Sequence, residues 1–225
     1  MHPSNRTGSR SGSRSCALLA ALFAFAVAVP ALAAEEVYSI DPVHSNVSFR
    51  IRHLTAKVTG AFMTYTGEIR LDRADLSKGS VTFEIETASI NTNNTDRDNH
   101  LRSPDFFEAE KHPKITFKST KVTVDKDDPN RMSVDGMLAM KGVSKPVSLK
   151  VELGGFVKDP WGNEKAGFDV TGRLNRKDYG ILWNKALDAG GFVLGDDVDV
   201  MISLEAAKKK EPAPETKKAE EGKKG

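Results

Sequence analysis

Residues 147–153 read VSLKVEL, so that apolar and polar side chains alternate without interruption. A period of two is typical of a β-strand that buries one face and exposes the other to water. The same alternation recurs in VSFRI at 47–51, VTFEI at 81–85 and VDVMISL at 198–204. These four segments lie far apart along the chain, and they predict an all-β protein in which antiparallel strands share one core.

Shorter versions of the pattern occur around residues 69–71, 115–117, 132–138 and 168–174. Turn-forming residues separate the segments at Lys78-Gly79, at 127–130 (DDPN) and at 159–163 (DPWGN). About eight strands, each with one dry face, must bury those faces against one another in a sandwich or a closed barrel.

One segment departs from the strand pattern. Between Thr95 and Ala109 the apolar residues Leu101, Phe106 and Phe107 follow a helical spacing, and Asn94 or Thr95 can cap the first turn. The sequence therefore predicts a short helix, interrupted near Pro104, inserted between two strands. Its two phenylalanines make it a candidate lid over one end of the barrel.

The two ends of the chain differ in composition from the middle. Residues 1–33 combine a basic Ser-rich start, a short apolar run and the ending ALA, which is typical of a cleavable signal peptide and predicts a secreted protein. Its apolar run is too short to span a membrane as a helix. Residues 206–225 are rich in Lys, Glu, Ala and Pro and predict a disordered tail, which leaves 34–205 for the barrel.

Charge and motifs exclude several functional classes. The whole chain has a formal net charge of +2, and the predicted barrel is slightly acidic, which argues against a nucleic-acid binder and allows at most peripheral membrane contact. The lone Cys16 lies in the leader, so no disulfide or thiolate metal site is expected. His44, His53, His100 and His112 show no metal-ligand spacing, and no nucleophile or nucleotide motif is present. We therefore expect no catalytic residues, no metal and no cofactor.

Glycines fall on the inward phase of several predicted strands, at Gly67, Gly136, Gly155 and Gly172. Glycine within a strand marks a bend, a bulge or a close approach of another group. Two interpretations stay open from the sequence. The glycines either bend the barrel wall or leave a hollow for a ligand, and an eight-stranded barrel is near the size at which the interior holds one small molecule.

Several stretches resemble a known family. They are DPVHS at 41–45, ASINT at 88–92, RDNHLRSPDFF at 97–107, HPKITFKS at 112–119, KGVSKPV at 141–147 and LNRKDYGI at 174–181. In this order they are similar to the YceI-like lipid/polyisoprenoid-binding family, over roughly residues 37–205. The resemblance implies a lipocalin-like antiparallel barrel, often dimeric, with an isoprenoid chain threaded through it. It also implies a periplasmic location, which agrees with the predicted leader.

The leading hypothesis is therefore non-catalytic binding, storage or transport of a long apolar isoprenoid lipid or quinone. The candidate ligand-binding side chains share an inward strand phase or a place on the predicted lid, and they are Phe49, Ile51, Phe83, Ile85, Phe106, Phe107, Phe117, Leu138, Leu149, Val170 and Trp183.

Two alternatives stay open beside this hypothesis. One is an enzyme that acts on the head group of such a lipid, with His44, His100 or Arg176 near the barrel mouth. The other is a barrel without a lipid that works through a protein partner.

Overall fold

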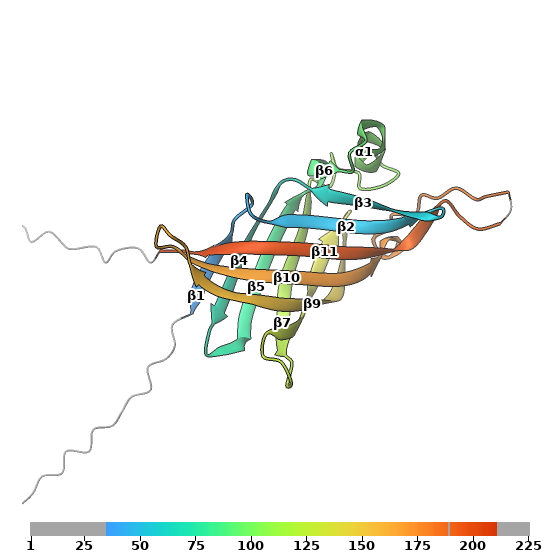
Figure 1. The fold of residues 1–225 in the computed structure, drawn as a ribbon. Coiled ribbons are helices and arrows are strands. Elements are labelled where there is room, and N and C mark those ends of the chain that lie inside the picture. The colour runs from blue at the N-terminus through green and yellow to red at the C-terminus, as the bar shows by residue number, and fades with distance from the viewer. Residues whose placement is uncertain (1–34, 189, 211–225) are drawn as a thin grey trace, which may run out of the picture. The chain divides into compact units, whose positions relative to one another are not determined.

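The computed structural model describes residues 35–188 and 190–210, so the predicted leader and most of the predicted tail lie outside the described residues. Strands dominate the described residues, with one α-helix and two short 3-10 helices (Figure 1). The elements are β1 Glu36–Ile40, β2 Asn46–His53, β3 Ala56–Phe62, β4 Tyr65–Asp72, β5 Asp75–Glu86, η1 Thr87–Ser89, β6 Ile90–Asn91, α1 Thr95–Arg102, β7 Lys114–Val124, β8 Arg131–Met140, β9 Val143–Lys158, β10 Glu164–Asn175, η2 Arg176–Tyr179 and β11 Leu194–Lys208.

The strands close into a barrel because β1 pairs with two neighbours. It runs antiparallel to β4 on one side and to the end of β11 on the other. The ring β1-β4-β5-β7-β8-β9-β10-β11 is thus an eight-stranded antiparallel β-barrel, which is the architecture that the family resemblance implied and one of the two that the alternation allowed. The described residues contain no helix that is both long and apolar enough to cross a membrane.

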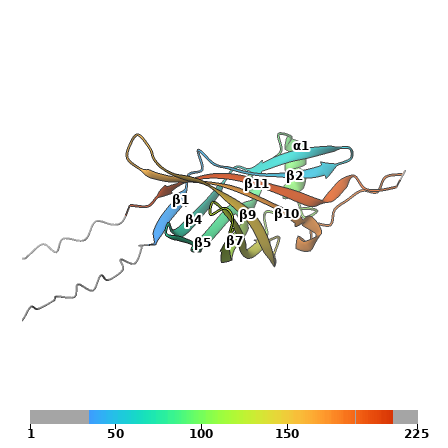
Figure 2. The ribbon, with the colours of Figure 1, turned by 60° about the horizontal axis from the view of Figure 1, so that its bottom comes forward.

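Strand β11 also carries a second set of strands. Its first part pairs with β2, which continues through β3 to the short β6. In Figures 1 and 2, β2, β11 and β10 run across β4, β5 and β7, so the two walls cross over a shared interior. The sequence predicted β2 and missed β1, β3 and β6, because EVYSI and AKVTGAF do not alternate cleanly.

Two sequence predictions about boundaries were wrong. Lys78 and Gly79 do not form a turn but lie within β5, and the chain turns at Arg73-Ala74 instead. There the Asp72 carboxylate accepts the Ala74 N–H at 2.8 Å, an Asx interaction that stabilises the turn without glycine. The barrel also extends past residue 205, since Ala206, Ala207 and Lys208 pair with β1.

The predicted helix is shorter than expected. Asn94 caps α1 by accepting the Arg97 N–H at 2.9 Å, but the helix ends at Arg102 and not near Ala109. The cause is Pro104, which forces the preceding Ser103 into an extended conformation with ψ 169°. Phe106 and Phe107 consequently lie in the turns that follow α1.

Tyr38 is fully buried where β1 closes the ring. Its hydroxyl donates to Glu36 at 2.6 Å and accepts from Arg73 at 2.6 Å. The Arg73 guanidinium lies over the Phe156 ring at 4.4 Å. Burial, followed by the Glu36 carboxylate, raises the pKa of Tyr38 to about 12. The phenol therefore stays protonated and serves as a structural hydrogen-bond donor.

Candidate functional site

The interior of the barrel is hollow. A cavity of about 590 Å³ lies between the crossing walls, and its lining is almost entirely apolar. This volume is within the range of small-molecule binding sites, which are typically concave and mostly apolar. We call it the barrel cavity. A well-packed core of this size would hold few voids larger than a water molecule, so an apolar space on this scale indicates a ligand site.

All eleven side chains predicted from the sequence line the barrel cavity. They are Phe49, Ile51, Phe83, Ile85, Phe106, Phe107, Phe117, Leu138, Leu149, Val170 and Trp183. The structure thus brings together residues from six strands and two loops, and contact with a ligand stays a prediction for each. Sequence reasoning missed other liners, such as Phe62 and Phe168. Phe168 shares the inward phase of Val170, and that phase was the signal that could have identified it.

A few polar side chains interrupt the apolar lining of the cavity, and they include five ionisable residues near the ends of elements. Asp96, Arg97 and His100 come from α1, His53 ends β2, and Arg176 comes from η2. Sequence reasoning considered His100 and Arg176 for the enzyme alternative only. The other three were missed because nothing in the sequence shows that α1 and the end of β2 contribute side chains to the barrel interior. We call Asp96, Arg97, His100, His53 and Arg176 the polar lining residues.

Arg176 is only 4 % exposed and is held by main-chain oxygens. It donates to the carbonyls of Ile181 at 2.7 Å and Trp183 at 2.8 Å, and it pairs with Asp196 at 3.1 Å. Burial lowers the pKa of Arg176, and the Asp196 carboxylate opposes that shift. These contacts fix the segment that carries Trp183 against the cavity, so Arg176 is a structural anchor of this segment.

Three aromatic side chains meet where the segment anchored by Arg176 lines the cavity. His100 lies 4.9 Å from Phe106 and 5.1 Å from Trp183 between ring centroids, and Phe106 lies 5.2 Å from Trp183. The His100 Nε2 is 3.0 Å from the Asp105 carboxylate. Phe106 is buried at 6 % exposure, so its ring covers apolar space, whereas His100 is partly exposed.

Helix α1 is tied to β6 by charged side chains. The buried Asp98 accepts from the Thr92 N–H at 2.8 Å and from the Thr92 hydroxyl at 2.5 Å. Arg102 donates to the carbonyls of Ala88 at 2.7 Å and Ile90 at 2.8 Å. The predicted lid therefore has the form of a fastened cover in this structure, and its opening stays a prediction.

The interpretation of the inward glycines as an empty hollow is wrong at three of the four positions. A methyl group at Gly67, Gly136 or Gly172 would lie within 2.6 Å of Phe83, Phe117 or Leu149, respectively. The space beside these three glycines is therefore filled by a neighbouring side chain and is not itself the hollow.

Gly155 behaves differently from the other three. It has φ +114° next to a shift in the register of β9 and β10, so it serves a bulge. The wall-bending interpretation holds there.

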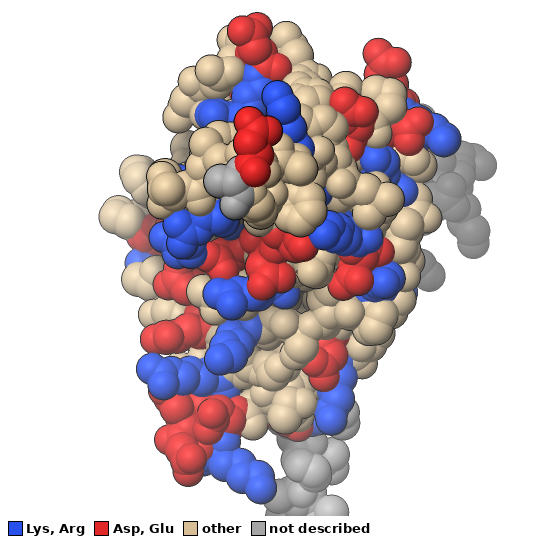
Figure 3. All heavy atoms as spheres, turned by 90° about the vertical axis from the view of Figure 1, so that its right-hand side faces the viewer, with Lys and Arg blue, Asp and Glu red and all other residues tan. Residues whose placement is uncertain are grey.

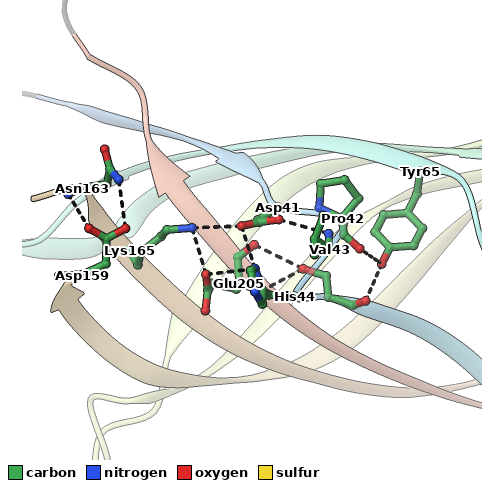
Figure 4. Close-up of polar contacts among 10 residues, drawn as sticks. Asp41, Pro42, Val43, His44, Tyr65, Asp159, Asn163, Lys165 and Glu205 are labelled. Carbon is green, nitrogen blue, oxygen red and sulfur yellow. Dashed lines mark hydrogen bonds and ion pairs between the residues drawn. The ribbon is translucent and has the colours of Figure 1, made fainter. Parts of the chain in front are cut away.

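His44 does not lie at the cavity. It belongs to a polar cluster in which the DPVHS loop meets β10 and β11 (Figure 4). The ligand atoms of Asp41, His44 and Glu205 lie within 4.8 Å of one another, a grouping that spacing along the sequence did not reveal. The Lys165 ammonium lies 2.9 Å from both carboxylates, so it already supplies the positive charge that these acids need.

The cluster fastens distant parts of the barrel. Hydrogen bonds from His44 and then from Lys165 hold the pKa of Asp41 well below its usual range. The Ser45 hydroxyl donates to the Glu205 carbonyl at 3.2 Å and accepts the Glu205 N–H at 3.0 Å. The arrangement explains the DPVHS stretch as a structural clasp between the β1–β2 loop and β11.

Acidic and basic side chains are interspersed on the face shown in Figure 3, which is the right-hand side of Figure 1. This face has no continuous basic stripe of the kind that tracks a nucleic-acid backbone.

Comparison with known proteins identifies the family. The model of the YceI-like domain matches residues 38–206, which is most of the chain. The chain belongs to the YceI-like family. A UPF0312 protein of Pectobacterium atrosepticum is 38 % identical to this YceI-like chain, and the alignment covers 85 % of this chain and 96 % of the relative.

Solved structures agree with this assignment. The Campylobacter jejuni YceI protein is 35 % identical, with a TM-score of 0.59 over 71 % of the YceI-like chain and 90 % of that structure. A polyisoprenoid binding domain from Saccharophagus degradans is 20 % identical, with a TM-score of 0.52 over 76 % of the chain and 98 % of that structure. At that identity, the second likeness shows the shared fold alone.

Proposed function

We propose that the protein binds a long apolar isoprenoid lipid or quinone in the barrel cavity and carries or stores it without altering it. The observation that carries the proposal is the closed barrel with an apolar cavity of about 590 Å³. The name of the Saccharophagus degradans neighbour, a polyisoprenoid binding domain, is in line with this ligand class.

Burial alone supplies enough free energy for such binding. Each CH₂ moved from water into an apolar site contributes about 0.8 kcal/mol. An isoprenoid chain that fills the cavity therefore needs no polar contact along its length. Among the polar lining residues, Asp96, Arg97 and His100 share α1, and we propose this helix as the partner of the head group.

The enzyme alternative has weaker support in the geometry. Of its three candidate residues, His44 lies in the outer cluster and Arg176 is engaged with three carbonyls and Asp196. His100 lines the cavity, and its side chain contacts the Asp105 carboxylate. Among the described residues, its hydrogen bonds include no Ser, Thr or Lys that it could activate as a nucleophile. The geometry therefore favours ligand binding over catalysis at this site.

The proposed ligand and the predicted leader support a place of action outside the cytoplasm. A long isoprenoid resides in membranes and needs shelter to cross water, so we propose a periplasmic carrier that meets membranes only peripherally. N-terminal sequencing of the exported protein should give a start at Ala34 or Glu35. Light scattering would test the homodimer that the family resemblance implies.

Mass spectrometry of organic extracts from purified protein tests the proposed function. We expect one isoprenoid lipid or quinone per cavity, unchanged after prolonged incubation. A lipid that changes chemically on the protein would support the enzyme alternative. Protein that carries no lipid, even after exposure to membrane extracts, would contradict lipid carriage.

A further inference from the structure

A repeated arrangement of glycine and a large side chain surrounds the barrel cavity. In four different strand pairs, a glycine on one strand lies beneath a side chain from the neighbouring strand. The pairs are Gly60 on β3 with Phe49 on β2, Gly67 on β4 with Phe83 on β5, Gly136 on β8 with Phe117 on β7, and Gly172 on β10 with Leu149 on β9.

The contacts are too close for any other residue type in the present arrangement. A Cβ atom on Gly60 would lie 2.5 Å from the Phe49 Cζ, and one on Gly172 would lie 2.6 Å from the Leu149 Cδ2. Real Cβ atoms do not approach carbon atoms this closely, so the covering side chain would have to turn away.

The direction of that turn matters for the ligand. Phe49, Phe83, Phe117 and Leu149 all line the barrel cavity, whereas the four glycines beneath them do not. The wall behind each side chain is backbone, so the open space available to a displaced side chain is the cavity itself. Glycine therefore lets each large side chain lie flat along the wall, as in the pairing of aromatic rings with strand glycines.

We propose that Gly60, Gly67, Gly136 and Gly172 set the cross-section of the barrel cavity and thereby select the width of the bound chain. This inference rests on the proposed function. An isoprenoid carries a methyl branch on every repeat, so it is wider than an unbranched alkyl chain of equal carbon number. With the four side chains held flat, the cavity accepts the branched chain.

Gly172→Ala is the cleanest test. Its Cβ meets the flexible end of Leu149 at 2.6 Å, and its other neighbours lie at 3.9 Å or beyond. Gly136 is less suitable, because its Cβ would also meet the Lys118 carbonyl oxygen at 2.6 Å. Gly167→Ala is a matched control on the same strand, since its nearest neighbours lie at an ordinary 4.0 Å.

The experiment measures binding of two alcohols with the same number of carbons, the branched geranylgeraniol and the unbranched eicosanol. Gly172→Ala should weaken geranylgeraniol binding about tenfold and eicosanol binding by no more than about twofold, as overpacking penalties of this kind suggest. Gly167→Ala should change neither. The double variant Gly172→Ala with Leu149→Ala removes the displaced side chain and should restore geranylgeraniol binding.

Two results would overturn the inference. One is unchanged binding of both alcohols by Gly172→Ala, and the other is an equal loss of both that follows its unfolding midpoint. A wild-type protein that binds neither alcohol would count against the proposed function instead. In that case a crystal structure of Gly172→Ala decides the inference, because it requires Leu149 to turn into the cavity and an unmoved Leu149 contradicts it.

Discussion

The rings of Phe106 and Trp183 lie 5.2 Å apart, although 77 positions separate the two residues in the chain's numbering. Phe106 follows α1, whereas Trp183 belongs to the segment that Arg176 anchors by its carbonyl hydrogen bonds. The contact joins two irregular segments over one end of the barrel cavity. It makes that end an apolar seal with polar groups around it.

Loosening this seal should speed the release of a bound lipid. Phe106→Leu keeps the site apolar but removes the ring contacts with His100 and Trp183. We expect a faster release rate and a loss of unfolding free energy below about 3 kcal/mol, since only part of the buried ring is removed. Release of a fluorescent isoprenoid into acceptor vesicles measures the rate. Phe192→Ala is the control, because Phe192 is 63 % exposed and does not line the cavity.

The attachment of α1 should control how often the cover opens. Asp98→Ala removes the acceptor of two hydrogen bonds from Thr92. Leaving those buried donors unpaired should cost about 1–3 kcal/mol and raise amide hydrogen exchange across α1. Asp105→Ala, which removes an exposed carboxylate from the same region, is the comparison. Equal exchange in the two variants would argue that Asp98 does not hold the helix.

The clasp around Asp41 predicts an acid-sensitive contribution to stability. Because the folded-state pKa of Asp41 is depressed, its contribution is fully present above the unfolded value near 3.8 and is lost as the pH falls toward the folded value. Asp41→Asn should therefore lower the unfolding midpoint at neutral pH, and the difference from wild type should shrink below about pH 4. A difference that stays constant from pH 7 to pH 2 would contradict this role of the carboxylate.

Metal removal should leave the fold unchanged. Asp41, His44 and Glu205 resemble a ligand set in their spacing, but the Lys165 ammonium already contacts both carboxylates. We expect the same melting temperature with EDTA and with added zinc. A rise of several degrees with zinc, abolished by His44→Ala, would show that a metal can displace the lysine.

The strand faces were predictable because burial of one side enforces a period of two. Phe49, Phe83 and Leu149 could be placed on the cavity from alternation alone. The polar lining residues were not predictable, since the part that α1 and η2 take in the cavity wall depends on how distant segments pack. The two interpretations of the glycines could not be separated from the sequence, because their partners such as Phe117 sit on neighbouring strands whose register the sequence does not give.

Photocrosslinking tests most directly whether the lipid lies inside the barrel. A geranylgeraniol with a diazirine in mid-chain would be bound, irradiated and mapped by peptide mass spectrometry. If the lipid lies in the barrel cavity, we expect adducts on cavity-lining residues such as Phe117, Leu149 and Val170. Adducts confined to the exposed side chains of Trp161, Leu182 and Phe192 would place the lipid on the surface and contradict the account.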